Sequence, residues 1–320
     1  MNRRIASVAA VLIATGTLAL AGCATSAGDG TSGTGDGTSG TGTGGVSGRV
    51  IQVAASINAW GSILAQLGGT HVQATSIITN PDTDPHAYEP TPKDGTVIAR
   101  SQLFVQNGIG YDSWAAKSLA ASPSPGRLVI DVGDLVHVWN GGNPHRWYSP
   151  TDVSAVADAI TADLKKLDPA DAAYFDAQRQ RFQSVGLADY HRLIAEIRAT
   201  YAGTPVGASE SIVAPLAQAL GLDLITPPSF LKDISEGTDP SAADLARINA
   251  QISGEQIKVY VFNSQNSTPD VAAQVSAAKV AGIPVSTVTE TLAPAGDTFQ
   301  QWQSRQLSAL LAALHQATGK

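Results

Sequence analysis

The stretch VIQVAASINAWGSILAQL, from Val50 to Leu67, contains the pattern that decides the fold. A short β-branched run, Val50–Ala54, is followed by a segment with the apolar spacing of a helix, Trp60–Leu67. More runs of both kinds follow: the strand candidates Val72–Ile78, Leu103–Asn107 and Leu128–Val132, and the helix candidate Pro92–Ser101. Strands that alternate with helices predict a mainly parallel sheet built from βα units.

The same alternation returns near the start of the second half, with strand candidates Pro205–Ala208, Leu224–Ile225, Val259–Phe262 and Pro284–Val288 and helix candidates Ile212–Leu220, Ser241–Ile252, Val271–Ala281 and Thr298–His315. Between the two series, a helical pattern runs from Asp168-Pro169 to Tyr201, with Gly186 as its weak point. We therefore expect an α/β fold with two pseudo-symmetric lobes. Each lobe holds a roughly four-stranded, mainly parallel sheet flanked by helices, and one long helix joins the lobes.

The first 48 residues differ in composition from the rest. Arg3 and Arg4 precede an apolar run that ends in Leu20-Ala21-Gly22-Cys23, which resembles a bacterial lipobox, and a Gly/Ser/Thr-rich segment follows. Cleavage before Cys23 and acylation of its thiol would tether the chain to a membrane; an ordinary secretion signal is the alternative. We expect a lipoprotein signal peptide at 1–22, a lipid-anchored flexible linker at 23–48, an N-terminal lobe at 49–168, a linking helix at 169–201 and a C-terminal lobe at 202–320.

The overall composition excludes several classes of protein. The formal net charge of −7 is mildly acidic and has no basic cluster, so the chain does not resemble a nucleic-acid binder. Its single cysteine, Cys23, rules out internal disulfides and any cysteine-based zinc cluster. Small cations are a more natural partner for this chain than polyanions.

Candidate ligands follow the predicted strands at their carboxyl ends, where parallel sheets place their functional loops. The first lobe offers His86 and His145, and the second offers Glu210 and Glu290. If the two sheet edges face one another, two imidazoles and two carboxylates meet, a ligand set that suits Mn, Fe or Zn. Spacing alone leaves the hypothesis open, because loop histidines are usually solvated and carboxylates after strands commonly cap helices.

A set of motifs gives a family resemblance that covers nearly the whole body of the chain. The chain resembles the metal-binding subunit of zinc/manganese ABC importers, the cluster A-I solute-binding lipoproteins. The matching segments are Val53–Ser56 with Trp60, Gly68-Gly69, the DPHAYEPTPKD stretch of residues 84–94, the NGIGYD stretch of residues 107–112, Asn143–Trp147, Ala219–Leu222 and Pro240-Ser241. The resemblance implies two α/β lobes joined by one rigid helix, with the metal bound between them.

Carried over by position, the resemblance places the first two ligands on His86 and His145. Many zinc-binding members have histidine at the third position, where this chain has Glu210. The turn Thr289-Glu290-Thr291 matches the position of the fourth ligand, so Glu290 is the choice there. Asp297 is its competitor, with N-capping of the last helix as its alternative role. His137 has no motif match and is interpreted as a surface or loop histidine, with an auxiliary role in metal capture as the alternative. His71, His191 and His315 lie on predicted strand or helix faces and are interpreted as structural or solvated.

The function that we expect is a non-enzymatic, monomeric binding protein at the outer face of the cytoplasmic membrane. It would capture Zn²⁺ or Mn²⁺ and deliver the ion to an ABC permease with its ATPase. The residues do not decide between the two metals, although zinc binds such a ligand set more tightly by the Irving–Williams order. Two alternatives stay open: a metal-dependent hydrolase that uses the same site, and a surface adhesin or metallochaperone with the same fold.

Overall fold

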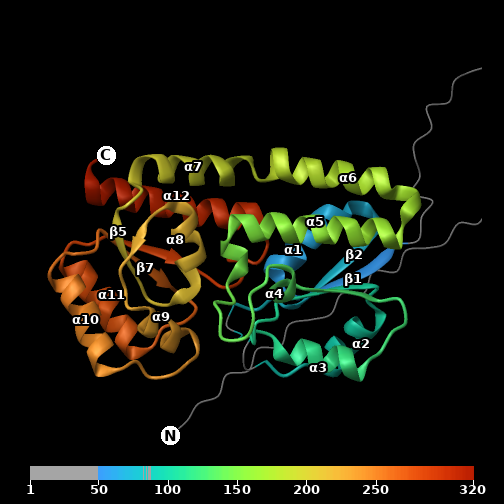
Figure 1. Cartoon of the computed structure of the whole chain (residues 1–320), viewed down its shortest axis with the longest axis horizontal. Coiled ribbons are helices and arrows are strands. Elements are labelled where there is room, and N and C mark those ends of the chain that lie inside the picture. The colour runs from blue at the N-terminus through green and yellow to red at the C-terminus, as the bar shows by residue number, and fades with distance from the viewer. Residues whose placement is uncertain (1–49, 82, 84, 86–87) are drawn as a thin grey trace, which may run out of the picture. The chain divides into compact units, whose positions relative to one another are not determined.

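The structure is a computed structural model that describes residues 50–81, 83, 85 and 88–320. Within these residues lie two four-stranded sheets, and every strand pair in both is parallel. The first sheet has the order β2-β1-β3-β4 and the second has the order β6-β5-β7-β8, so both follow one topology. Figure 1 shows β1 and β2 of the first sheet in blue and β5 and β7 of the second in yellow to orange. The predicted α/β fold of two similar lobes is therefore confirmed.

The strands of the first sheet are β1 Ile51–Ile57, β2 Val72–Ile78, β3 Leu103–Gln106 and β4 Leu128–Asp131, and those of the second are β5 Pro205–Ala208, β6 Asp223–Leu224, β7 Val259–Asn263 and β8 Val285–Val288. The helices around the first sheet are α1 Asn58–Gly68, α2 Pro92–Arg100, α3 Ser113–Ala121, α4 Val132–Leu135 and α5 Pro150–Leu167. The helices of the remaining chain are α6 Ala172–Arg181, α7 Ala188–Tyr201, α8 Ala214–Leu220, α9 Pro228–Ser235, α10 Ala242–Ser253, α11 Pro269–Val280 and α12 Phe299–Thr318.

The linking helix between residues 169 and 201 contains a π-helical turn. Helix α6 passes through a π-helix at Phe182–Gly186 before α7 begins, and the amide of Leu187 donates to the carbonyl of Phe182, 2.8 Å away. Phe182 and Leu187 are both buried, and their five-residue spacing is too long for one α-helical turn. The π-turn absorbs the extra residue and keeps both side chains on the packed face. Gly186, the predicted weak point, lies inside this turn.

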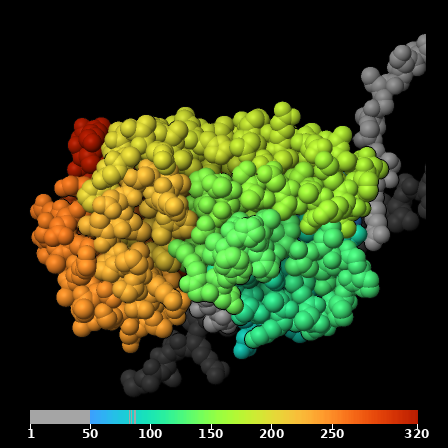
Figure 2. Space-filling model, in the orientation of Figure 1, coloured from blue at the N-terminus to red at the C-terminus, as the bar shows by residue number. Residues whose placement is uncertain are grey.

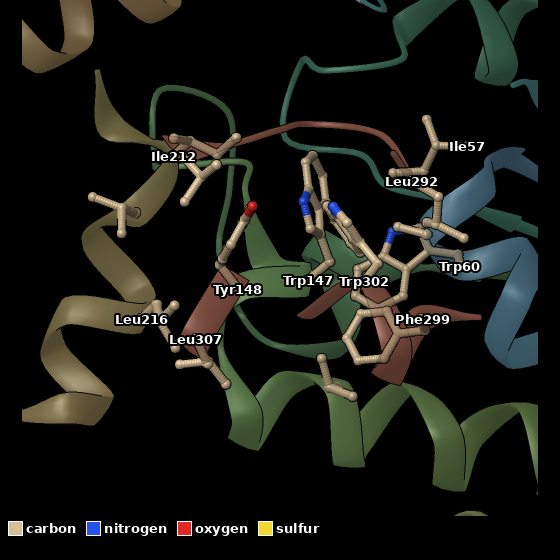
Figure 3. Packing of buried hydrophobic residues seen from close by; sticks show 14 of the residues in the cluster. Ile57, Trp60, Trp147, Tyr148, Ile212, Leu216, Leu292, Phe299, Trp302 and Leu307 are labelled. Carbon is tan, nitrogen blue, oxygen red and sulfur yellow. The ribbon is translucent and has the colours of Figure 1, made fainter. Parts of the chain in front are cut away.

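A shared aromatic core joins the two lobes (Figure 3). Trp60 of α1 meets Trp147 edge to face at 6.3 Å between ring centroids, and Trp302 of α12 meets Tyr148 at 5.8 Å. All four side chains are fully buried. Helix α12 belongs to the second lobe, yet it runs beside α7 and contacts α1 of the first (Figure 1). The lobes therefore pack on each other over a common apolar interior rather than meeting only at the linking helix.

Replacing Tyr148 with phenylalanine is expected to destabilise the contact between the lobes. The Tyr148 hydroxyl lies 2.8 Å from the carbonyl of Thr289 and 2.9 Å from Gln306 Oε1. Losing this buried donor should lower the free energy of unfolding by about 1–3 kcal/mol, measured by urea denaturation. Tyr201→Phe is the matched control, because that hydroxyl donates to the terminal residue, Lys320. Equal losses in the two variants would contradict the assignment.

Candidate metal centre

Three of the four predicted ligands lie together between the two sheets. Glu210 follows β5, Glu290 follows β8, and His145 lies between α4 and α5. One ligand atom from each residue lies within 4.8 Å of the ligand atoms of the other two. His145 and Glu210 are buried and Glu290 is half-buried. The carboxyl edges of the two sheets thus face each other, which the sequence pattern had left as a condition.

His86, the fourth predicted ligand, lies outside the described residues, as does Cys23. The chain that follows His86 is anchored to the start of α2. Tyr88 donates its hydroxyl to Asp94 at 2.7 Å, and Asp94 also accepts from the amide of Thr91 in a capping box. Burial raises the pKa of Asp94, but the hydrogen bonds from Thr91 and Tyr88 outweigh it and the pKa ends below its usual value. The Asp94 carboxylate is therefore a structural cap.

Asn143 orients the imidazole of His145. Its side-chain oxygen lies 2.9 Å from Nδ1 and accepts from the backbone amide of His145 at 3.0 Å. The ring also packs edge to face against Trp147 and Tyr111, with centroids 5.3 and 5.9 Å away. A histidine whose Nδ1–H donates to an oxygen presents Nε2 to a metal, which is the usual arrangement in protein metal sites.

Amides and a phenol hold the two carboxylates. Asn263 donates to Glu210 Oε1 at 2.7 Å and to Glu290 Oε1 at 3.2 Å. Asn266 donates to Glu210 Oε2 at 2.6 Å, and Tyr111 donates its hydroxyl to Glu290 Oε2 at 2.9 Å. The pKa of Tyr111 is raised well above its usual value by burial and then by the neighbouring Glu290. Tyr111 therefore stays protonated and acts as a donor.

Burial makes the Glu210 carboxylate costly to ionise without a cation. Desolvation, together with the nearby charge of Glu290, raises the pKa of Glu210 to about 8, against the opposing hydrogen bonds of Asn263 and Asn266. Two carboxylates in a low-dielectric site repel each other unless a positive charge lies between them. A divalent cation supplies that charge, and imidazole with carboxylate suits manganese, iron or zinc. The three residues therefore fit a divalent metal.

Comparison with known proteins identifies the family of this chain. Residues 53–313 match the model of the family described as zinc-uptake complex component A, periplasmic (ZnuA). The chain belongs to the ZnuA family. Among solved structures, it superposes on a ZnuA crystal structure with a TM-score of 0.66 at 21% identity, covering 84% of this chain and 99% of that one. At that identity the likeness establishes the fold.

A second solved structure has the same fold. It is the Mn-bound periplasmic metal binding protein from Candidatus Liberibacter asiaticus, with a TM-score of 0.69 and 20% identity over 83% of this chain and 100% of that one. The manganese-binding lipoprotein MntA of Halalkalibacterium halodurans is 25% identical over 42% of this chain and 46% of MntA. The ZnuA protein of Bacillus subtilis is 22% identical over 56% of this chain and 60% of that protein. The chain spans about half the length of the curated relatives it matches.

Asp297, the competitor for the fourth position in this ZnuA-family chain, has other partners. It forms an ion pair with Arg305 of α12. The expectation that Asp297 could cap the last helix is wrong, because Thr298 is the N-cap and its side chain accepts from the amide of Gln301. Threonine takes this role because its hydroxyl reaches the N3 amide while Gln301 bonds back to complete a capping box.

A second group of possible ligands in the described part of the chain lies far from the ZnuA site in sequence. His71, Asp168 and Asp171 place one ligand atom each within 4.8 Å of one another, and all three are half-buried. His71 Nδ1 already pairs with Asp171 at 2.9 Å, and its ring stacks on Tyr174 at 4.0 Å. This arrangement ties the entry of β2 to the start of the linking helix, in line with the structural role predicted for His71.

Sequence reasoning gave no role at the site to Asn143, Asn263, Asn266 or Tyr111. One observation could have found Asn263. It is the last residue of β7, and β7 lies between β5 and β8 in the sheet. A side chain at the end of the middle strand must lie between the residues that follow its two neighbours, which are Glu210 and Glu290. The sequence pattern leaves the order of the strands undetermined, and this order is needed to place Asn263 between the two carboxylates.

A hollow of about 470 Å³ lies beside the site, with walls from both lobes. Asn143 and Ser211 line it, and both also contact His145 Nδ1. The Asn143 amide donates to the carbonyl of Ser211 at 2.7 Å, which links the lobes across the wall. On the face shown in Figure 2, the green surface of the first lobe meets the yellow and orange surface of the second directly. Asn143 and Ser211 thus contact His145 and also line the hollow.

Proposed function

We propose that this chain is an extracytoplasmic solute-binding protein that captures Zn²⁺ or Mn²⁺ between its two lobes. The observation that carries the proposal is the convergence of His145, Glu210 and Glu290 from three separate segments of the chain. His86 would complete the ligand set, because it occupies the family's first ligand position. Two carboxylates would neutralise the charge of the ion, and two imidazoles would add affinity without further charge.

We also propose that the chain delivers the bound ion to a membrane permease and its ATPase. This delivery is supported by membership of the ZnuA family, whose description is that of a zinc-uptake complex component. We further propose that Cys23 carries a lipid that holds a monomeric body at the outer face of the cytoplasmic membrane. The names of relatives such as MntA, a manganese-binding lipoprotein, support this anchor. No helix among the described residues is long and apolar enough to span a membrane.

We propose a binding protein in preference to a metal hydrolase. A hydrolytic site needs a base that is close to the metal but does not ligate it. Both carboxylates of the group are assigned here as ligands, and Asn263, Asn266 and Tyr111 already donate to their oxygens. The division into lobes at 49–168 and 202–320 with a linking helix at 169–201 belongs to the same proposal, since it places ligands on both sides of one cleft.

Calorimetric titration of the purified chain with Zn²⁺ and Mn²⁺ tests the proposal. We expect one ion per chain, with zinc bound at least as tightly as manganese. Glu290→Ala should weaken binding of both metals, and Asp297→Ala, the matched control from the same loop, should leave it unchanged. Binding of manganese alone, absence of binding, or loss of affinity only in Asp297→Ala would contradict the assignment.

A further inference from the structure

Asn263 occupies a central position that the proposed ligand set leaves unexplained. Its side-chain nitrogen donates to Glu210 Oε1 at 2.7 Å and to Glu290 Oε1 at 3.2 Å, so one amide bridges the two carboxylates. Its side chain is fully buried. Strand β7 fixes the place of this residue, because β7 pairs with β5 on one side and with β8 on the other.

The orientation of the Asn263 amide is fixed by its other contacts. Its side-chain oxygen accepts from the backbone amide of Gln265 at 3.0 Å, and its own backbone amide donates to Ser209 Oγ at 2.9 Å. Because the oxygen faces Gln265, the NH₂ group must face the carboxylates. The side chain of Gln265 in turn accepts from the amides of Glu290 and Thr291, at 2.7 and 3.0 Å. The bridge is therefore held from both sides.

A neutral donor at this point serves a site that must receive a cation. Buried carboxylates side by side need compensation, and a lysine or arginine would supply it but would also occupy the place of the metal. Asparagine donates hydrogen bonds without adding charge, so the electrostatic demand for a cation stays. Glu210 follows the same rule at its other oxygen, where Asn266 is the donor.

We propose that Asn263 is a positioning residue that holds Glu210 and Glu290 in one arrangement before the metal arrives, and that this arrangement favours zinc over manganese. The inference rests on the proposed function. Zinc takes about four ligands at short distances near 2.0–2.2 Å, which a fixed pair of carboxylates can supply at once. Manganese prefers six oxygen-rich positions, so it gains more from carboxylates that can turn.

The test compares metal affinities of the full chain with those of two Asn263 variants. Asn263→Leu removes the donor and the acceptor at similar size, and Asn263→Asp keeps the acceptor for Gln265 but lacks the donor. In Asn263→Leu we expect zinc affinity to fall roughly 10–100-fold, the range for residues that support metal ligands. Manganese affinity should fall less, so the ratio of zinc affinity to manganese affinity should decrease. Asn249→Leu, on the exposed face of α10, is the matched control.

Infrared spectra of the metal-bound proteins separate positioning from folding. We expect the carboxylate stretching bands of both variants to lie at different frequencies from those of the wild type. The reason is that Glu210 and Glu290, without the hydrogen bonds from Asn263, would bind the ion in a different mode. If Asn263→Leu does not fold, the test uses Asn263→Asp alone. The ratio of zinc affinity to manganese affinity should then be lower in Asn263→Asp than in the wild type. An unchanged ratio and unchanged bands in either folded variant would overturn the inference.

The inference and the proposed function fail in different ways. If Glu210 and Glu290 are not ligands, their own substitution leaves zinc binding intact, and the proposed function falls first. If their substitution abolishes binding while Asn263→Asp binds both metals with the wild-type ratio, the ligand set stands and only the role of Asn263 is wrong.

Discussion

Glu210→Gln is expected to weaken zinc binding by more than 100-fold. Loss of a residue that only supports a metal ligand lowers metal affinity roughly 10–100-fold. Glu210 is assigned as a ligand itself, so its loss should lower the affinity further. The substitution removes the carboxylate that would bind the ion and keeps the size of a side chain that is fully buried. The free protein should stay folded, because glutamine has the size of glutamate and carries no charge, whereas burial and then the nearby Glu290 make the native carboxylate costly and raise its pKa.

The matched control is Glu236→Gln. Glu236 is an exposed glutamate beside the hollow next to the site, so its substitution makes the same chemical change outside the proposed ligand set. Competition titration with a chelator of known affinity measures both variants. Zinc affinity in Glu210→Gln within tenfold of the wild type, or an equal loss in the two variants, would remove Glu210 from the ligand set.

Metal affinity is expected to increase roughly tenfold for each unit by which the pH is raised towards about pH 8, from the Glu210 proton alone. The pKa of Glu210 is raised from 4.5 to about 8 in the metal-free protein, so the carboxyl keeps its proton at neutral pH. Because the ion binds the carboxylate, this proton must leave when the metal arrives. Titrations in buffers of different ionisation enthalpy count the released protons, and a flat affinity between pH 6.5 and 8 would contradict the assignment.

The same shift determines how the stability of the metal-free protein depends on pH. The folded state binds the Glu210 proton up to about pH 8 and the unfolded chain releases it near 4.5. Between these values the folded state holds more protons, so the free energy of unfolding should fall as the pH rises. Glu210→Gln cannot titrate there and serves as the control. A metal-free protein that becomes more stable across this interval would contradict the raised pKa.

The βα pattern predicted the sheets well because buried parallel strands read as short apolar runs bounded by turn residues. Val72–Ile78 and Pro205–Ala208 agree with β2 and β5 residue for residue. β1 runs three residues further than predicted, to Ile57, because Ala55 and Ile57 pair with Ser76 and Ile78 of β2. Sequence reasoning assigned no helix to α3 or α9.

Some residues of the candidate site could be predicted from the sequence and others could not. His145, Glu210 and Glu290 could be selected because they follow predicted strands and match family motifs. The hydrogen bonds of Asn263 and Asn143 depend on strand order and on the path of a loop, and neither leaves a periodic trace in the sequence. The metal preference also lies beyond the pattern, since it depends on how freely two carboxylates can turn.

The aromatic core between the lobes limits how far the lobes can separate. Opening a hinge would expose Trp60, Trp147 and Trp302, which are fully buried where α1 and α12 meet. Burying a large side chain contributes about 1.5–3 kcal/mol each, so thermal motion alone would rarely separate the lobes. Metal binding therefore spends little free energy on closing the protein, and nearly all of it appears as affinity. Under the proposed function, we expect the ion to leave by loss of individual ligands rather than by wide separation of the lobes.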